Sequence, residues 1–108
     1  MGVAVPPRIN LFRAQMLRDL GSNSWRMSHN PGAQSTYDIL DRLGVVVWDE
    51  TRQLGTDKVF VDGMQDMVRQ HRNHPSVVVY SMCNEGHCDA YDWNFHPHPN
   101  SINDPGTF

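Results

Sequence analysis

Two short runs of consecutive apolar residues constrain the fold of this chain more than any other feature. They are residues 45–48 (VVVW) and 77–80 (VVVY), and each follows a segment whose apolar residues recur at helical spacing. A continuous apolar run is typical of a parallel strand covered on both faces, because both sets of alternating side chains are then buried. Parallel neighbours need a crossover connection, usually a helix, so the alternation predicts an α/β fold with parallel strands.

The pattern predicts three successive helix–strand units. The expected helices are residues 8–20, 33–43 and 59–72, and the expected strands are residues 24–28, 45–48 and 77–80. Pro6 and Pro7 stand where a helix tolerates proline, and Gly44 is a typical C-terminal cap. On the first helix we expect one apolar face to point to the core, made of Ile9, Phe12, Met16, Leu17 and Leu20.

Polar or ionisable side chains follow every predicted strand. In parallel α/β folds the chemistry lies at the carboxyl ends of the strands. Those ends read Arg26-Met27-Ser28-His29, Trp48-Asp49-Glu50 and Cys83-Asn84-Glu85. The sequence therefore predicts a site where these three ends meet.

Glu85 and Asn84 are the first candidates for that site. A carboxyl at the mouth of a buried strand loses part of its hydration, which raises its pKa toward that of a general acid. The Asn84 amide beside it can exchange hydrogen bonds with a sugar hydroxyl. The alternative is that both residues only cap the turn before Gly86.

The other strand ends each leave two interpretations open. Arg26 and His29 could hold a carboxylate or a hydroxyl of a substrate, or they could be a surface arginine and a turn histidine. Asp49 and Glu50 could be paired site carboxylates, although neighbouring strand residues normally point to opposite sides. Their alternative is a pair of salt bridges, to Arg42 or Arg52.

Composition excludes several classes of function. The formal charge of −3 gives no basic excess for binding a nucleic acid, and no apolar run approaches the roughly 18 residues of a membrane span. The sequence contains neither a glycine-rich phosphate loop nor a nucleotide-binding fingerprint, so we expect no cofactor. Cys83, His87 and Cys88 do not have the spacing of a metal site, so we expect no metal. Residues 72–75 are interpreted as structural, with Asn73 and His74 bonded to the loop backbone.

Several segments resemble glycoside hydrolase family 2, the β-galactosidase, β-glucuronidase and β-mannosidase family. Residues 23–31 (NSWRMSHNP) resemble its N-x-x-R-x-S-H-x-P stretch, and residues 41–50 (DRLGVVVWDE) are similar to its D-x-x-G-hydrophobic-D-E strand. Residues 72–77 (RNHPSV) and 81–86 (SMCNEG) resemble the R-N-H-P-S-V signature and the S-x-x-N-E strand end. The motifs stand in the family's order. His71, before the third of them, replaces the acidic residue usual there.

The resemblance implies a (β/α)8 barrel and a retaining glycosidase, β-galactosidase-like, with a β-glycoside as its carbohydrate substrate. Glu85 matches the family's general acid/base. Asn84 matches the residue that contacts the sugar 2-hydroxyl, and Arg26, His29 and Glu50 match strand-end positions of the sugar pocket. No residue matches the family's nucleophile. The loop after Glu50 departs from the β-galactosidase pattern, which leaves galactose as the sugar open.

Length bounds what the resemblance can mean. A complete barrel takes about 250 residues, whereas this chain has 108. We therefore expect residues 1–88 to form part of a barrel domain, followed by an irregular tail at 89–108, and we expect no turnover from the chain alone. The alternative is a non-catalytic fragment that binds carbohydrate weakly, docks on a complementary chain, or associates with itself through open strand edges.

Overall fold

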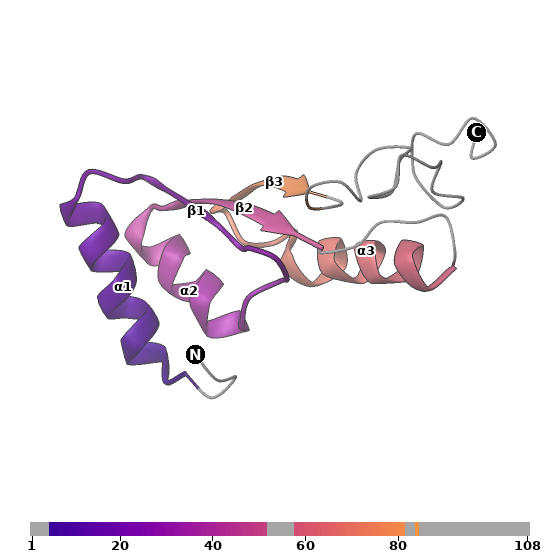
Figure 1. Ribbon diagram of the computed structural model, residues 1–108, viewed down its shortest axis with the longest axis horizontal. Helices are drawn as coiled ribbons and strands as arrows, with labels where there is room; N and C mark the ends of the chain where they lie inside the picture. Colours follow the sequence, from indigo (N-terminus) through magenta and orange to yellow (C-terminus); the bar gives the residue numbers. More distant parts are fainter. Residues whose placement is uncertain (1–4, 52–57, 82–83, 85–108) are drawn as a thin grey trace, which may run out of the picture.

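The predicted alternation of helices and strands is confirmed. A computed structural model describes residues 5–51, 58–81 and 84. Its elements in chain order are α1 (Pro7–Asp19), β1 (Ser24–Arg26), α2 (Gln34–Leu43), β2 (Val46–Glu50), α3 (Lys58–His71) and β3 (Val77–Ser81). The strands form one parallel sheet in the order β1-β2-β3. Figure 1 shows α1 and α2 side by side against one face of this sheet.

Strand register brings the three carboxyl ends to the same edge of the sheet. Arg26 at the end of β1 pairs with Trp48 of β2, and Glu50 at the end of β2 pairs with Ser81 at the end of β3. A register shift lies between Val47 and Trp48 on β2. Four strand bounds differ from those predicted, since β1 stops at Arg26, β2 runs from Val46 to Glu50 and β3 continues to Ser81. The longer β2 places both acidic residues inside the sheet.

Local sequence explains where the helices begin and end. Pro7 is the first residue of α1, where its missing N–H costs no helical hydrogen bond. Gly44 ends α2 with φ 65°, a left-handed conformation that glycine adopts without steric cost. Its N–H donates to the Asp41 carbonyl, which closes the last turn. The tight end returns the chain directly into β2.

The core lies between the helices and one face of the sheet. It consists of Ala14, Met27, Tyr37, Leu40, Val45 and Val47, all buried. Along β2 the side chains alternate, so Val47 packs in this core whereas Val46 and Trp48 point to the other face, with 41% and 46% exposure. The sheet is therefore covered on one face by its own helices.

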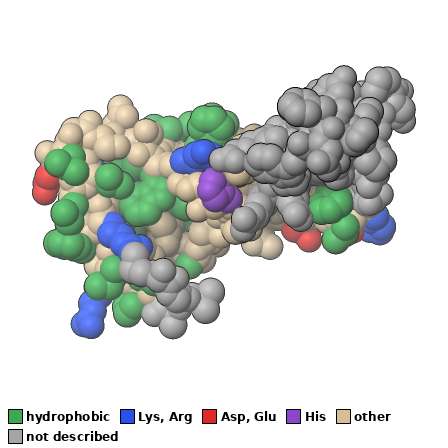
Figure 2. All heavy atoms as spheres, in the orientation of Figure 1, with side chains coloured by type: hydrophobic (Ala, Val, Ile, Leu, Met, Phe, Trp, Pro, Cys, Tyr) green, Lys and Arg blue, Asp and Glu red, His purple; other side chains and the backbone are tan. Residues whose placement is uncertain are grey.

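The predicted core face of α1 is wrong. Phe12 and Leu20 are 59% and 80% exposed, and Figure 2 shows hydrophobic side chains at the surface over α1. The helix instead packs on α2 through Ala14, with a hydrogen bond from Asn10 Nδ2 to Thr36 Oγ1 (3.0 Å) beside it. Periodicity identifies an apolar stripe, but α1 meets α2 through Asn10 and Ala14, which are not members of that stripe. On α3, Met67 is buried as a core residue.

Candidate active site

The carboxyl edge of the sheet gathers most of the predicted site residues. The Arg26 guanidinium forms a two-pronged contact with Glu50, from Nε to Oε2 (2.7 Å) and from Nη2 to Oε1 (3.0 Å). The same Nη2 donates to Asn84 Oδ1 (2.7 Å), just beyond β3. His29 Nδ1 lies 3.3 Å from Glu50 Oε1. These contacts join side chains from all three strand ends, while Glu85 lies outside the described residues.

The electrostatics of this group keep Glu50 ionised. Its side chain is fully buried, and burial alone would raise its pKa. The hydrogen bonds from Arg26 outweigh burial, and with the help of His29 they lower the pKa of Glu50 below its usual value. An ionised carboxylate only accepts hydrogen bonds, so Glu50 can hold Arg26 and His29 in place. The guanidinium also lies over the Trp48 ring, 5.7 Å from its centroid.

The structure shows neither Asp49 nor Glu50 paired with Arg42, one of the two partners considered from the sequence. Glu50 pairs with Arg26 and His29 rather than with Arg42, and Arg52 lies outside the described residues. Asp49 points to the opposite side of β2, as the alternation of a strand requires. There it meets Tyr37 and His71 instead of an arginine. Both side chains have 0% exposure, so β2 ends in two buried carboxyl groups with separate sets of partners.

Sequence reasoning missed the environment of Asp49. Tyr37 donates from its hydroxyl to Asp49 Oδ1 (2.6 Å), and His71 Nδ1 lies 2.6 Å from Oδ2. The Tyr37 and His71 rings stack with their centroids 4.1 Å apart. The alternation of side chains between the two faces of a strand was a usable signal. If Glu50 faces the site, then its neighbour Asp49 faces the helices and needs donors from them.

A second group of polar side chains lies at the opposite end of the sheet, near the amino ends of the strands. His74 Nδ1 lies 2.6 Å from Asp41 Oδ2, and the Ser76 backbone N–H donates to Asp41 Oδ1 (3.0 Å). The His74 ring thus bonds to a side chain on α2. As predicted, His74 also bonds to neighbouring backbone, with its backbone N–H donating to the His71 carbonyl (2.9 Å) and its carbonyl accepting from the Val77 N–H (3.1 Å). Burial acts to raise the pKa of Asp41, but hydrogen bonds from Ser76 and His74 lower it below its usual value.

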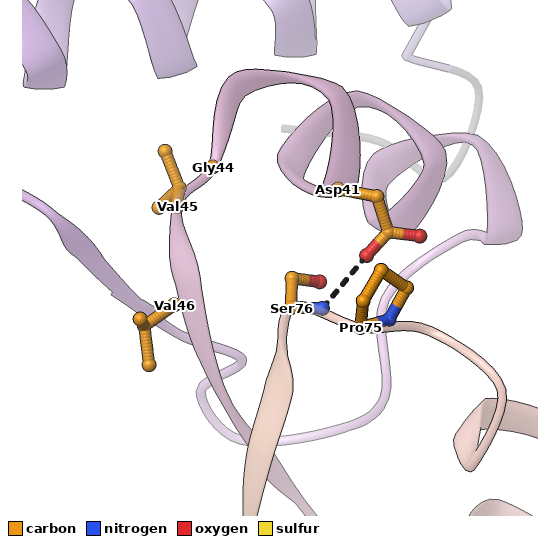
Figure 3. Close-up of a pocket in the computed structure, with 6 residues that line it drawn as sticks. All are labelled: Asp41, Gly44, Val45, Val46, Pro75 and Ser76. Carbon is orange, nitrogen blue, oxygen red and sulfur yellow. Dashed lines mark hydrogen bonds between the residues drawn. The ribbon is translucent and has the colours of Figure 1, made fainter.

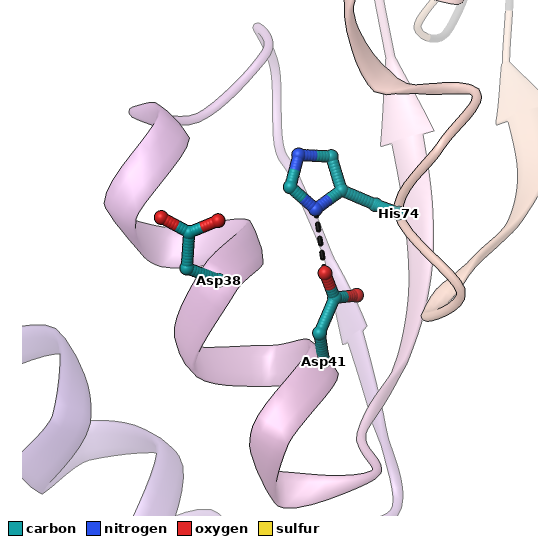
Figure 4. A group of neighbouring side chains, drawn as sticks. All are labelled: Asp38, Asp41 and His74. Atoms are coloured by element: carbon teal, nitrogen blue, oxygen red, sulfur yellow. Dashed lines mark hydrogen bonds and ion pairs between the residues drawn. The ribbon is translucent and has the colours of Figure 1, made fainter.

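Asp38 joins Asp41 and His74 in a cluster whose candidate metal-ligand atoms lie within 4.8 Å of one another (Figure 4). Asp41 already accepts hydrogen bonds on both oxygens, from His74 and from the Ser76 N–H. These hydrogen bonds tie α2 to the loop before β3, and we call them the clamp. The arrangement fits this structural role better than the binding of a cation. The residues weighed as metal ligands from the sequence, Cys83, His87 and Cys88, lie outside the described residues.

A cavity of about 200 Å³ adjoins this clamp. Figure 3 shows the side chains that line it, from the end of α2, the start of β2 and the loop before β3. Val45 and Pro75 contribute apolar walls, and Ser76 Oγ has no hydrogen-bond partner among the described residues. The cavity lies at the amino ends of the strands, away from the Arg26–Glu50 pair. No described helix is long and apolar enough to cross a membrane.

Comparisons with known proteins identify the family of this chain. The family model for glycosyl hydrolases family 2, TIM barrel domain, matches residues 10–57 and 53–98. A beta-glucuronidase of Bacteroides fragilis is 34% identical over 99 residues, and a beta-galactosidase of Bacteroides ovatus is 33% identical over 97. Each alignment covers 79% of this chain but only 14% and 11% of the relative. The chain thus spans a small part of the length of these proteins.

Solved structures show the same arrangement. A beta-glycosidase from Bacteroides vulgatus superposes with a TM-score of 0.72 at 31% identity, over 78% of this chain and 12% of that one. A Bifidobacterium dentium beta-glucuronidase, complexed with coumarin-3-O-glucuronide, gives 0.69 at 28% identity, over 74% and 14%. The three helix–strand units are therefore a segment of a larger barrel. With the family model matching most of its residues, this chain belongs to glycosyl hydrolases family 2 and carries part of the TIM barrel domain.

Proposed function

We propose that this chain supplies the acid/base segment of a retaining glycosidase that acts on β-glycosides. The observation that carries the proposal is the joined group of Arg26, His29, Glu50 and Asn84 at the carboxyl edge of a family 2 barrel segment. Such edges hold the active site in barrel enzymes. Glu85, the family's acid/base by position, follows Asn84 directly in the sequence.

The contacts of Asn84 support its role in holding a sugar. Its Oδ1 accepts from Arg26 Nη2, which fixes the orientation of the amide and leaves the NH2 group as the donor for a substrate hydroxyl. Arg26 is 44% exposed on its side chain even while it holds Glu50. A half-exposed arginine side chain beside an oriented amide suits a ligand rich in hydroxyl or carboxylate oxygens.

In the proposed reaction Glu85 first protonates the glycosidic oxygen as the bond to the sugar breaks. It then takes a proton from water, which attacks and releases the covalent sugar–enzyme intermediate. The nucleophile of such a reaction is a second carboxylate about 5–5.5 Å from the first, and no residue of this chain matches it. We therefore expect turnover only when the segment is combined with the rest of a barrel.

A chimera tests this proposal. Residues 10–98 would replace the aligned segment of the Bacteroides fragilis relative, and hydrolysis of aryl β-glucuronides and aryl β-galactosides would be compared. Glu85→Gln should lower kcat/KM by about 10²–10⁴-fold for poor leaving groups and much less for good ones, because good leaving groups need little protonation. Added azide should restore turnover by replacing water as the attacking group. The β-galactosidase-like preference stays a prediction that the two substrates decide.

Asp66→Asn, an exposed carboxyl exchange on α3, is the matched control and should keep full activity. A chimera that folds by circular dichroism but hydrolyses neither substrate would contradict the proposal. So would a Glu85→Gln effect that is equal for good and poor leaving groups.

A further inference from the structure

Three hydrogen bonds hold the buried side chain of Asp49. Its carboxylate accepts from the Tyr37 hydroxyl (2.6 Å), from the Glu50 backbone N–H (3.1 Å) and, at Oδ2, from His71 Nδ1 (2.6 Å). The residue itself is fully buried. Asp49 is therefore held from α2 and from α3 at once, directly behind Glu50.

Tyr37 connects this carboxylate to the loop after β1. Its hydroxyl accepts from the Gly32 backbone N–H (2.9 Å) while it donates to Asp49. Burial, reinforced by the hydrogen bond to Asp49, raises the pKa of Tyr37, so the hydroxyl stays protonated and remains a donor. The loop that Tyr37 holds contains His29, which contacts Glu50 on the far side of β2.

His71 closes the cluster from the last turn of α3. Its side chain is 3% exposed and stacks on the Tyr37 ring. The centroid of the His71 ring also lies 6.1 Å from that of the His74 ring, and His74 is bonded to Asp41. His71 is thus placed by packing as well as by its hydrogen bond to Asp49.

We propose that Asp49, Tyr37 and His71 form a positioning cluster for the sugar site. The cluster sets the position of the β2 end and of the loop after β1, and through Glu50 it sets the position of Arg26 and Asn84. All three members are buried, so we assign them a positioning role and no contact with the substrate. That the groups so positioned bind a sugar rests on the proposed function, whereas the positioning itself is a property of the free chain.

The Arg26 Nε–H resonance is the readout, because this proton donates to the buried Glu50 carboxylate. It would be recorded by nitrogen-15 NMR on the full 108-residue chain without ligand. Tyr37→Phe keeps the stacked ring and removes the hydroxyl that joins Gly32 to Asp49. We expect solvent exchange of Arg26 Nε–H to become about tenfold faster or more, since the Glu50 position is then less restrained.

Thr36→Val is the matched control. It also removes one buried hydroxyl from α2, but that hydroxyl bonds to Asn10 and not to the cluster. It should lower stability while leaving the Arg26 exchange rate unchanged. A purely structural role for Tyr37 predicts the same Arg26 exchange in both variants, and that result would overturn the proposal.

His71 provides an independent comparison if Tyr37→Phe does not fold. His71→Asn keeps an N–H that can reach Asp49, whereas His71→Leu does not. We expect the asparagine variant to retain slow Arg26 exchange and the leucine variant to lose it. Equal exchange in the two would count against the cluster. A shift in Arg26 exchange together with an inactive chimera would refute the glycosidase proposal and leave the positioning cluster standing.

Discussion

Glu50 shows how a buried charge is retained at the edge of a sheet. Its carboxylate is removed from water, but each oxygen receives a hydrogen bond from Arg26 and one also faces His29. The two-pronged geometry matches the planar guanidinium to the planar carboxylate, which a lysine could not reproduce. The half-exposed Arg26 side chain keeps contact with solvent, which limits the cost of desolvating the pair.

Replacing Glu50 by glutamine should make stability less dependent on pH. The folded-state pKa of Glu50 is lowered, so the unfolded chain binds more protons and stability rises with pH. This contribution is complete above the unfolded pKa of about 4.3 and is lost as pH falls through the folded value. At pH 7 we expect Glu50→Gln to cost about 1–2 kcal/mol, discounted because Arg26 is partly solvated. Urea titrations at pH 7, 5, 4 and 3 measure it.

The difference between wild type and Glu50→Gln should shrink toward pH 3. A residual slope should persist in the variant, because the pKa of Asp41 is lowered as well. A difference that stays constant from pH 7 to pH 3 would show that Glu50 does not titrate with the assigned sign.

At the scale of elements, the end of α2 depends on the backbone of one glycine. Gly44 has φ 65°, and a Cβ added there would meet no atom within 4 Å, so only backbone strain opposes a side chain. Gly44→Ala should lower the free energy of unfolding by about 1 kcal/mol. Gly63, inside α3, also has open space and carries no positive φ, so Gly63→Ala should raise it by about 1 kcal/mol. Thermal unfolding of both variants tests the opposite signs.

The clamp between α2 and the loop before β3 predicts unequal roles for two acidic residues. Asp41→Asn replaces one of the two oxygens that face His74 and the Ser76 N–H by an NH2 donor, and we expect a loss of about 1–2 kcal/mol. Asp38→Asn, at an exposed position one turn earlier, should change stability by less than about 0.5 kcal/mol. Denaturation with and without zinc provides the check. A zinc-dependent rise in Tm that Asp38→Asn abolishes would instead favour a metal site.

Sequence patterns predicted the order of the elements better than their contacts. The apolar runs at 45–48 and 77–80 identified β2 and β3, although the predicted burial on both faces is wrong for the described sheet, where Val46 is 41% and Val79 43% exposed. The face of α1 was predicted wrongly. Phe12 belongs to an apolar stripe, but the spacing of apolar residues does not show which element packs against that stripe. The joined strand ends followed from topology. The Tyr37–Asp49–His71 cluster did not, because the order of elements does not say which side chains of α2 and α3 turn toward Asp49.

At the scale of the whole molecule, the two faces of the sheet are unequal. The helices α1 and α2 cover one face (Figure 1), whereas Val46, Trp48 and Val79 on the other are 41%, 46% and 43% exposed. In a closed barrel the inward side chains of all strands fill the centre together. The described strands β1 and β3 also form the two edges of this sheet. The exposed face is thus the side that the remaining strands of a barrel would cover.

This asymmetry predicts that the isolated chain associates as its concentration rises. Burying the open face removes Val46 and Val79 from water, and open strand edges add backbone hydrogen bonds. We expect the weight-average mass in sedimentation velocity to increase between about 10 and 500 µM. Val79→Lys should shift the increase to higher concentration because it places a charge in the contact. Val59→Lys removes a 70% exposed valine from α3 instead and should leave association unchanged. A monomer throughout this range, or equal effects of both lysines, would mean that the open sheet face does not drive association, and docking on a complementary barrel segment would then need another surface.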